Sequence, residues 1–212
     1  MGYREASHDH WNSVWTNYPQ ETSDNWLDKF EDIISPCSTP ILDLGCGLGN
    51  NTFTLYHLGK NVIACDQSEV AVRSIQRKKF SKIEAVCFNM LDKFPFKDDS
   101  FDVIIADLSL HYFNKKDTKS VIHEIRRVLK PDGYLLFRVN SVNDTEHGAG
   151  KGKELEHHLY SNNGMLKRFF DSMDIKEFFG DMGIEYINEE LMTRYTKSKW
   201  VYIVRAKNSK GY

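Results

Sequence analysis

The sequence predicts a doubly wound α/β fold, and three observations support this fold class. Short apolar runs at residues 41–44, 61–66 and 101–106 alternate with segments of helical periodicity. A glycine-rich stretch follows the first run, as is typical of the first strand-to-helix turn in such sheets. The length of 212 residues suits one domain with a modest cap. Strands joined through helices at this spacing form a parallel sheet with right-handed crossovers.

The first part of the chain is predicted to be a helical lid. Residues 1–35 are rich in Trp and Tyr, and Trp11, Trp15 and Tyr18 recur at the spacing of one helical face. Pro36 and Pro40 then interrupt the chain. We therefore expect an N-terminal lid segment at residues 1–35 and the main domain at residues 36–212.

The regular alternation of elements begins after Pro40. Strands are expected at residues 41–44, 61–66, 83–88, 101–106 and 134–139, with helices at 50–58, 68–80 and 117–129. Ser68 and Asp117 are suitable N-caps for the second and third of these helices. Pro131 and Gly133 end the third helix and turn the chain into the fifth strand.

The last third of the chain follows a different pattern. Residues 141–170 are polar, contain four glycines, and are predicted to form a long loop on the substrate side. A helix is expected at residues 173–182 and two strands at 184–189 and 200–206. The short link between these two strands favours an antiparallel pair that closes the sheet.

Composition narrows the class of function. The 28 basic and 30 acidic side chains give a net charge of −2, without the basic excess typical of nucleic-acid binders. Cys46, Cys65 and Cys87 lie in apolar runs and are expected to be buried, reduced thiols. The sequence has no apolar run near the roughly 20 residues that a membrane helix needs, so we expect a cytoplasmic protein that binds neither membranes nor nucleic acids.

The glycine loop and a later acid indicate a nucleoside-containing cofactor. Gly45, Gly47 and Gly49 allow the backbone to turn sharply and to approach a ligand without a Cβ atom in the way. Asp66 ends the next predicted strand, and an acid at this place accepts hydrogen bonds from ribose hydroxyls.

Asp43 and Asn50 decide between two such cofactors. A dinucleotide fingerprint requires glycine at the sixth place of the loop, where this chain has Asn50. Asp43 precedes the loop, and its carboxylate would repel a pyrophosphate but attract the ammonium group of an amino-acid tail. The pattern therefore favours S-adenosylmethionine (SAM) over NAD.

Four sequence blocks within residues 41–139 resemble the class I SAM-dependent methyltransferases. The blocks are LDLGCGLGN, VIACDQS, NMLDKFPFKDDSFDVIIADLSLHYF and RVLKPDGYLLFRVNS. The chain looks like the type 11 domain, and its C-terminal part is similar to the small-molecule, tellurite-resistance-like branch. The resemblance implies a Rossmann-like sheet of seven mostly parallel strands in the order 3-2-1-4-5-7-6, ending in an antiparallel strand.

The resemblance also carries roles to individual residues. It places Asp43 near the methionyl ammonium group and the glycine loop along the cofactor, with Asp66 at the ribose. The adenine would lie between Gln67, Asn89 and Met90, and Asp107 would lie near the sulfonium. The full set of implied cofactor-binding residues is Asp43, Gly45, Cys46, Gly47, Asp66, Gln67, Asn89, Met90 and Asp107.

The expected reaction is methyl transfer from SAM, with S-adenosylhomocysteine (SAH) as product, to a small-molecule acceptor. His111 follows the fourth strand and is the candidate general base, although alignment and desolvation can supply much of the rate without one. Trp15, Arg138 and Tyr160 are candidate acceptor contacts; Arg138 is either the partner of an anionic acceptor or a surface charge at a strand end.

Three alternatives stay open at this point. The acceptor could be a protein or an RNA, or the chain could bind SAM without catalysis. His147, His157 and His158 lie near acidic residues, but their spacing fixes no ligand pair, so we expect no metal site. The sequence does not indicate an oligomeric state.

Overall fold

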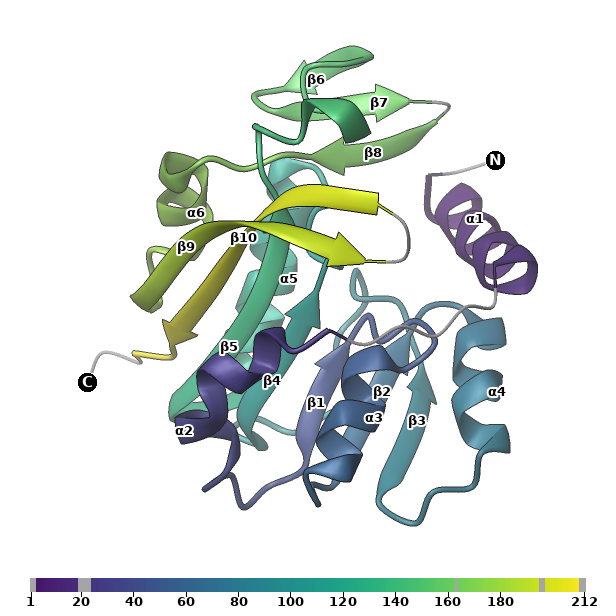
Figure 1. The fold of residues 1–212 in the computed structure, drawn as a ribbon, viewed down its shortest axis with the longest axis vertical. Helices are drawn as coiled ribbons and strands as arrows, with labels where there is room; N and C mark the ends of the chain where they lie inside the picture. Colours follow the sequence, from purple (N-terminus) through teal and green to yellow (C-terminus); the bar gives the residue numbers. More distant parts are fainter. Residues whose placement is uncertain (1–2, 19–23, 163, 195–196, 210–212) are drawn as a thin grey trace.

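The computed structural model describes residues 3–18, 24–162, 164–194 and 197–209. A seven-stranded sheet with the order β3-β2-β1-β4-β5-β10-β9 forms its centre (Figure 1). The strands β3, β2, β1, β4 and β5 pair in parallel, and β10 pairs antiparallel with both β5 and β9. This order confirms the predicted sheet and its antiparallel closing pair. The strand bounds are β1 Ile41–Leu44, β2 Val62–Asp66, β3 Ile83–Cys87, β4 Phe101–Asp107, β5 Leu129–Asn140, β9 Gly183–Arg194 and β10 Lys197–Lys207.

Helices cover both faces of the sheet. One face carries the turns η1 (Trp26–Phe30) and α2 (Glu31–Ile34) together with α3 (Asn50–His57), and the other carries α5 (Lys115–Val128) and α6 (Ser172–Phe179). The helix α4 (Glu69–Arg77) lies beside β3 at the end of the sheet, and α1 (Tyr3–Asn17) lies apart from the sheet beyond the upper end of α4 in Figure 1. The helices that follow β1 and β4 therefore lie on opposite faces of the sheet, as expected where the winding reverses between these two strands.

Local capping explains where the helices begin. The Ser68 hydroxyl accepts a hydrogen bond from the Ala71 N–H at 3.3 Å, as predicted. For α5 the cap is Asn114, which accepts from the Asp117 N–H at 2.8 Å, so the predicted cap at Asp117 was wrong by three residues. Asp171 caps α6 in a capping box with Asp174.

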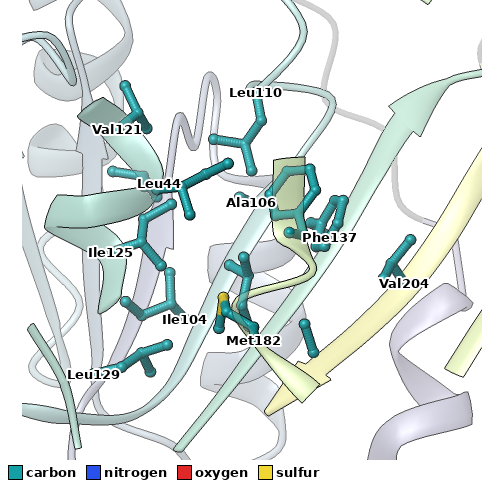
Figure 2. Close-up of a cluster of buried hydrophobic side chains, with 14 of the residues drawn as sticks. Leu44, Ile104, Ala106, Leu110, Val121, Ile125, Leu129, Phe137, Met182 and Val204 are labelled. Atoms are coloured by element: carbon teal, nitrogen blue, oxygen red, sulfur yellow. The ribbon is translucent and has the colours of Figure 1, made fainter. Parts of the chain in front are cut away.

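The main core fills the space between the sheet and the helices α5 and α6. Figure 2 shows Leu44, Ile104 and Phe137 of three neighbouring strands facing Ile125 of α5 and Met182. All five side chains are at least 98% buried. Because apolar burial contributes about 25 cal/mol per Å², this layer holds β1, β4 and β5 in fixed positions. The loops at their carboxyl ends are therefore carried on a rigid base.

Two expectations about the chain need correction. The segment at residues 141–170 is not one long loop, because it contains the short turn η2 (Thr145–His147) and a three-stranded antiparallel sheet. The strands of this small sheet are β6 Lys153–Glu156, β7 Leu159–Asn162 and β8 Met165–Arg168. Cys87 was expected to be buried, but it is exposed because it ends β3 at the edge of the main sheet. Within the described residues, the helices are all too short or too polar to cross a bilayer.

Candidate active site

A cavity of about 510 Å³ opens at the carboxyl ends of β1, β2 and β4. This volume is typical of a small-molecule site, and the place is the one where ligands bind in doubly wound sheets. Eight of the nine residues expected to bind the cofactor line this cavity. They are Gly45, Cys46, Gly47, Asp66, Gln67, Asn89, Met90 and Asp107.

The glycine loop brings bare backbone to the cavity wall. Gly45 and Gly47 have φ angles of 77° and 53°, in the left-handed region that side-chain-bearing residues avoid. A Cβ atom on Gly45 would lie 2.4 Å from the Ser109 Cβ, and one on Gly47 would lie 2.8 Å from the Trp15 ring. Both glycines are therefore required by backbone angle and by close packing.

Asp66 lies where the loop, β2 and α4 meet. Its carboxylate accepts hydrogen bonds from the Gly47 N–H at 2.9 Å and from the Ser68 N–H at 2.8 Å. Burial raises the pKa of this carboxyl, while the two N–H donors oppose the shift. Next to it, the Asn89 amide donates to the Gln67 side-chain carbonyl at 3.1 Å. These contacts hold three polar side chains of the cavity in fixed positions.

Asp43 is the one predicted cofactor residue that does not line the cavity. Only 1% of it is exposed, and the Thr52 hydroxyl donates to its Oδ2 at 2.5 Å. Burial, together with the negative charges of Asp107 and Asp66, raises the pKa of the Asp43 carboxyl from 3.8 to about 7. The side chain lies beneath the loop and ties β1 to α3, because strand alternation directs it into the interior.

Arg138 corrects a second prediction, since it is neither a surface charge nor part of the cavity lining. It is 1% exposed and forms two hydrogen bonds with Asp107, at 2.7 and 2.8 Å. Its Nη1 and Nη2 atoms donate to Asp24 at 2.7 and 3.2 Å, and its guanidinium lies 4.7 Å from the Trp26 ring centroid. The Asp107 carboxylate also accepts from the Asn51 amide at 3.2 Å. Arg138 therefore balances one buried carboxylate, Asp107, and one half-buried carboxylate, Asp24, at the base of the site.

The helix α1 covers the cofactor end of the cavity. Ser7, Trp11 and Trp15 of this helix all line the cavity, and the rings of Trp11 and Trp15 stack at 5.8 Å. Two polar contacts tie α1 to the carboxyl end of β2. The Ser68 hydroxyl donates to the side-chain oxygen of Asn12 at 2.6 Å, and the Gln67 amide donates to the Ser7 hydroxyl at 3.1 Å. The expected third member of the aromatic face, Tyr18, is 71% exposed and takes no part.

His111 and Tyr160 lie outside the cavity lining. His111 is 1% exposed, and its buried Nδ1 has no hydrogen-bond partner among the described residues. Burial and the nearby charges of Lys167 and Lys199 hold the pKa of this imidazole well below its usual value. Tyr160 packs edge-on against Phe169 at 6.0 Å in the small sheet. Neither side chain is placed to contact a molecule in the cavity.

The far end of the cavity is formed by residues that sequence reasoning did not select as acceptor contacts. His147 follows β5, Lys167 belongs to β8, and Met192 and Lys199 lie near the connected ends of β9 and β10. Lys167 is half-buried, donates to the His147 carbonyl at 2.9 Å, and has its pKa lowered to about 8 by burial and by Lys199. No local motif marks these positions, because they lie on four separate elements that meet only in the folded chain.

One cluster of side chains that could ligate a metal lies away from the cavity. The ligand atoms of His157, His158, Asp171 and Asp174 lie within 4.8 Å of one another. His158 Nδ1 already contacts Asp174 at 2.7 Å, and Asp171 caps α6. Both carboxylates are thus committed to local hydrogen bonds, and the absence of a metal stays a prediction.

Residues 42–137 match the family described as "Methyltransferase domain". A mitochondrial arginine-hydroxylase NDUFAF5 from Danio rerio is 34% identical over 45% of this chain and 29% of its own length. A tRNA N(3)-cytidine methyltransferase METTL2 from Gallus gallus is 28% identical over 72% of this chain and 45% of its own length. The chain thus spans less than half the length of these curated relatives.

A solved structure shares the whole fold. It is a 1,6-didemethyltoxoflavin-N1-methyltransferase from Burkholderia thailandensis with bound 1,6-didemethyltoxoflavin and S-adenosylhomocysteine. The TM-score is 0.69 at 18% identity, and the alignment covers 98% of this chain and 90% of that one. At this identity the likeness establishes the fold, and the chemistry of the acceptor has to be argued from the site.

Proposed function

We propose that this chain transfers a methyl group from SAM to a small-molecule acceptor. Its residues 42–137 match a methyltransferase domain, and its fold is that of SAM-dependent methyltransferases. One observation carries the proposal. The cavity is continuous from the glycine loop, beneath α1, to the small sheet that bears Lys167. A cofactor at one end would therefore face an acceptor at the other, inside a single cavity.

The cofactor end has free groups that suit SAM. The indole N–H of Trp15 is buried without a hydrogen-bond partner among the described residues, and a ligand carboxylate could accept from it. Gly45 and Gly47 bring bare backbone to the wall of the cavity at this end. Asp66 and Asp107 line this end with carboxylates, which favour the positive charge of a sulfonium and an ammonium group.

Each lining residue then has a distinct role in holding the cofactor. Asp66 would accept hydrogen bonds from the ribose hydroxyls, and Gln67 and Asn89 would contact the adenine edge while Met90 packs on its face. Asp107 would face the methionyl part, held in place by Arg138. Asp43 would act from beneath the loop through its bond to Thr52, as a positioning residue.

The bound cofactor supplies an electrophilic methyl group on a sulfonium, which is already a good leaving group. The chain's contribution is to align the acceptor with that methyl and to exclude water. The aromatic side chains of Trp11, Trp15 and Tyr112 form the dry part of this enclosure. His111 does not line the cavity and is therefore not expected to contact the acceptor.

The size of the cavity supports a small acceptor over a macromolecule. A cavity of about 510 Å³ has room for a cofactor beside a small acceptor. The net charge of −2 provides no general attraction for RNA, although the likeness to a tRNA methyltransferase keeps RNA as the second candidate. A cytoplasmic location remains a prediction.

The test is to supply SAM with a labelled methyl group, together with a cell extract, and to follow the label. We expect it in the small-molecule fraction with the wild-type chain and a strong loss with Asp66→Ala. Label in RNA or in protein would contradict the small-molecule proposal. Tight SAM binding without transfer to any fraction would indicate a SAM-binding protein instead.

A further inference from the structure

A histidine and a carboxylate form a dyad at the acceptor end of the cavity. His147 Nδ1 lies 2.8 Å from Asp144 Oδ1, within the single turn η2 and the residue before it. The Asp144 side chain is 2% exposed, and its main-chain carbonyl accepts from the N–H groups of His147 and Ala149 at 3.1 and 3.2 Å. The carboxylate is thus fixed in place and orients the imidazole.

The other ring nitrogen of His147, Nε2, makes no hydrogen bond within the described residues. His147 lines the cavity, and its side chain is 20% exposed. The contact to Asp144 occupies only Nδ1. A buried carboxylate on Nδ1 with Nε2 open is the arrangement that lets histidine act as a general base.

Lys167 places a positive charge beside this histidine. Its Nζ donates to the His147 carbonyl at 2.9 Å, and the negative charge of Asp144 favours its protonated form. The lysine contacts the Phe169 ring at 4.9 Å, so that it is held from both sides. Lys199 lines the same end of the cavity. This end is therefore suited to a developing negative charge.

Aromatic side chains form part of the wall of the same cavity. Trp11 and Tyr112 meet edge to face at 5.0 Å, and Phe113 also lines the cavity. Such surfaces favour flat, aromatic ligands through offset and edge-on contacts. An acceptor that uses both the wall and the dyad would carry an ionisable group directly on an aromatic ring.

We propose that the acceptor is a phenol, that His147 oriented by Asp144 removes its proton, and that Lys167 stabilises the resulting phenolate. This inference rests on the proposed methyl transfer and names its substrate class. An amine acceptor attacks through a free lone pair and needs no such base. A phenol is a poor nucleophile until it is ionised, so its methylation requires a base such as His147 to remove the proton.

The step balances in atoms and charge. The phenol proton passes to His147 Nε2, and the oxygen forms a bond to the methyl carbon as the bond from that carbon to sulfur breaks. The sulfonium becomes a neutral thioether, and the product is an aryl methyl ether. The imidazolium then returns its proton to water, so that the chain is unchanged.

The test uses 4-nitrophenol, whose coloured anion is measured by absorbance, with the chain saturated with SAH. Bound nitrophenol should ionise at a pH at least one unit lower than free nitrophenol, corresponding to a tenfold shift in its ionisation equilibrium. His147→Gln and Lys167→Met should each remove most of this shift. Asp144→Asn should reduce it, because the imidazole loses its orientation, and Lys153→Met on the exposed strand β6 is the matched control.

Activity gives a second readout. With a phenol acceptor identified by turnover, His147→Gln should lower kcat by about 100-fold or more, and its rate should recover as pH rises and the phenol ionises in solution. The charged and titratable groups around His147 are Asp144 on its own segment, Lys167 on β8 and Lys199 on β10.

Several outcomes would overturn the inference. Nitrophenol that fails to bind to the SAH-saturated chain, or that ionises as it does in water, would contradict it. A full shift retained in both His147→Gln and Lys167→Met would do the same. Failure of the chain to bind SAH at all would instead refute the proposed function, so that the two failures are distinguishable.

Discussion

At the scale of single residues, burial changes the roles of the two charged side chains that sequence reasoning placed at the ligand. Asp43 and Arg138 are both 1% exposed, and both act from behind the cavity wall. Because a charged side chain that is buried needs a partner or a shifted pKa, both residues take part in specific interactions. Their partners, Thr52 for one and Asp24 with Asp107 for the other, depend on the folded chain.

The raised pKa of Asp43 makes stability depend on pH. Between about pH 4 and pH 7 the folded chain holds a proton on Asp43 that the unfolded chain has lost, so this residue's contribution to stability falls as pH rises through that range. Asp43→Asn should lack this dependence. We would measure the free energy of unfolding in denaturant, without cofactor, at pH 5, 6 and 7. Relative to the wild type, the value for the variant should rise with pH, by at most about 1.4 kcal/mol per pH unit.

A constant difference in unfolding free energy between variant and wild type would contradict this view of Asp43. Glu69→Gln is a useful control, because Glu69 is an exposed carboxylate that pairs with Arg73 on the surface of α4. Its substitution should leave the pH dependence of the wild type in place.

The Arg138 network predicts a large loss of stability. Arg138→Met would leave the carboxylates of Asp24 and Asp107 without their cation, at side-chain exposures of 17% and 4%. Breaking a buried pair in this way costs about 3–5 kcal/mol, whereas loss of an exposed pair costs about 0–1 kcal/mol. Arg73→Met, which breaks the exposed pair with Glu69, is the matched control. Equal losses for the two variants in denaturant unfolding would show that the network is not a structural requirement.

At the scale of elements, α1 and the small sheet form the two walls that the central sheet does not supply. The helix brings Trp11 and Trp15 over the glycine loop, and β8 brings Lys167 to the opposite end. Figure 1 shows both elements at the same end of the molecule, above the carboxyl ends of the strands. The sequence indicated α1 through the spacing of its aromatic residues. The segment at residues 141–170, which includes the small sheet, is polar and contains several glycines, and it shows no strand periodicity.

The position of Trp15 predicts that α1 closes over the bound cofactor. Trp15→Ala should weaken SAH binding by about tenfold, on the scale of one hydrogen bond or aromatic contact, since it removes the ring over Gly47 and the free indole N–H. Hydrogen exchange of residues 3–17 should slow when SAH binds to the wild type.

Tyr18→Ala provides the control for this experiment, because Tyr18 is 71% exposed at the end of the same helix. It should leave SAH affinity unchanged. Equal effects of the two substitutions, or removal of residues 1–18 without any change in affinity, would show that α1 is not a lid.

At the scale of the whole molecule, periodicity and spacing predicted the sheet more completely than the site. The order of the seven strands came from the resemblance to the class I methyltransferases, whereas the meeting of the glycine loop with Asp66 follows from the local βαβ connection between β1 and β2. The acceptor end joins His147, Lys167 and Lys199, which lie on three different elements. Such a meeting depends on tertiary packing, so no pattern along the chain could mark it.

The central claim is that this cavity binds SAM through Asp66 and the glycine loop. Calorimetric titration of the wild type with SAM tests it most directly, with Asp66→Ala as the variant and Glu69→Ala as the control. We predict saturable binding of one SAM per chain and no comparable binding of NAD. Asp66→Ala should weaken SAM binding by about 1.5–3 kcal/mol, or roughly 10- to 150-fold. Binding of NAD without binding of SAM, or unchanged SAM affinity in a folded Asp66→Ala variant, would contradict the account.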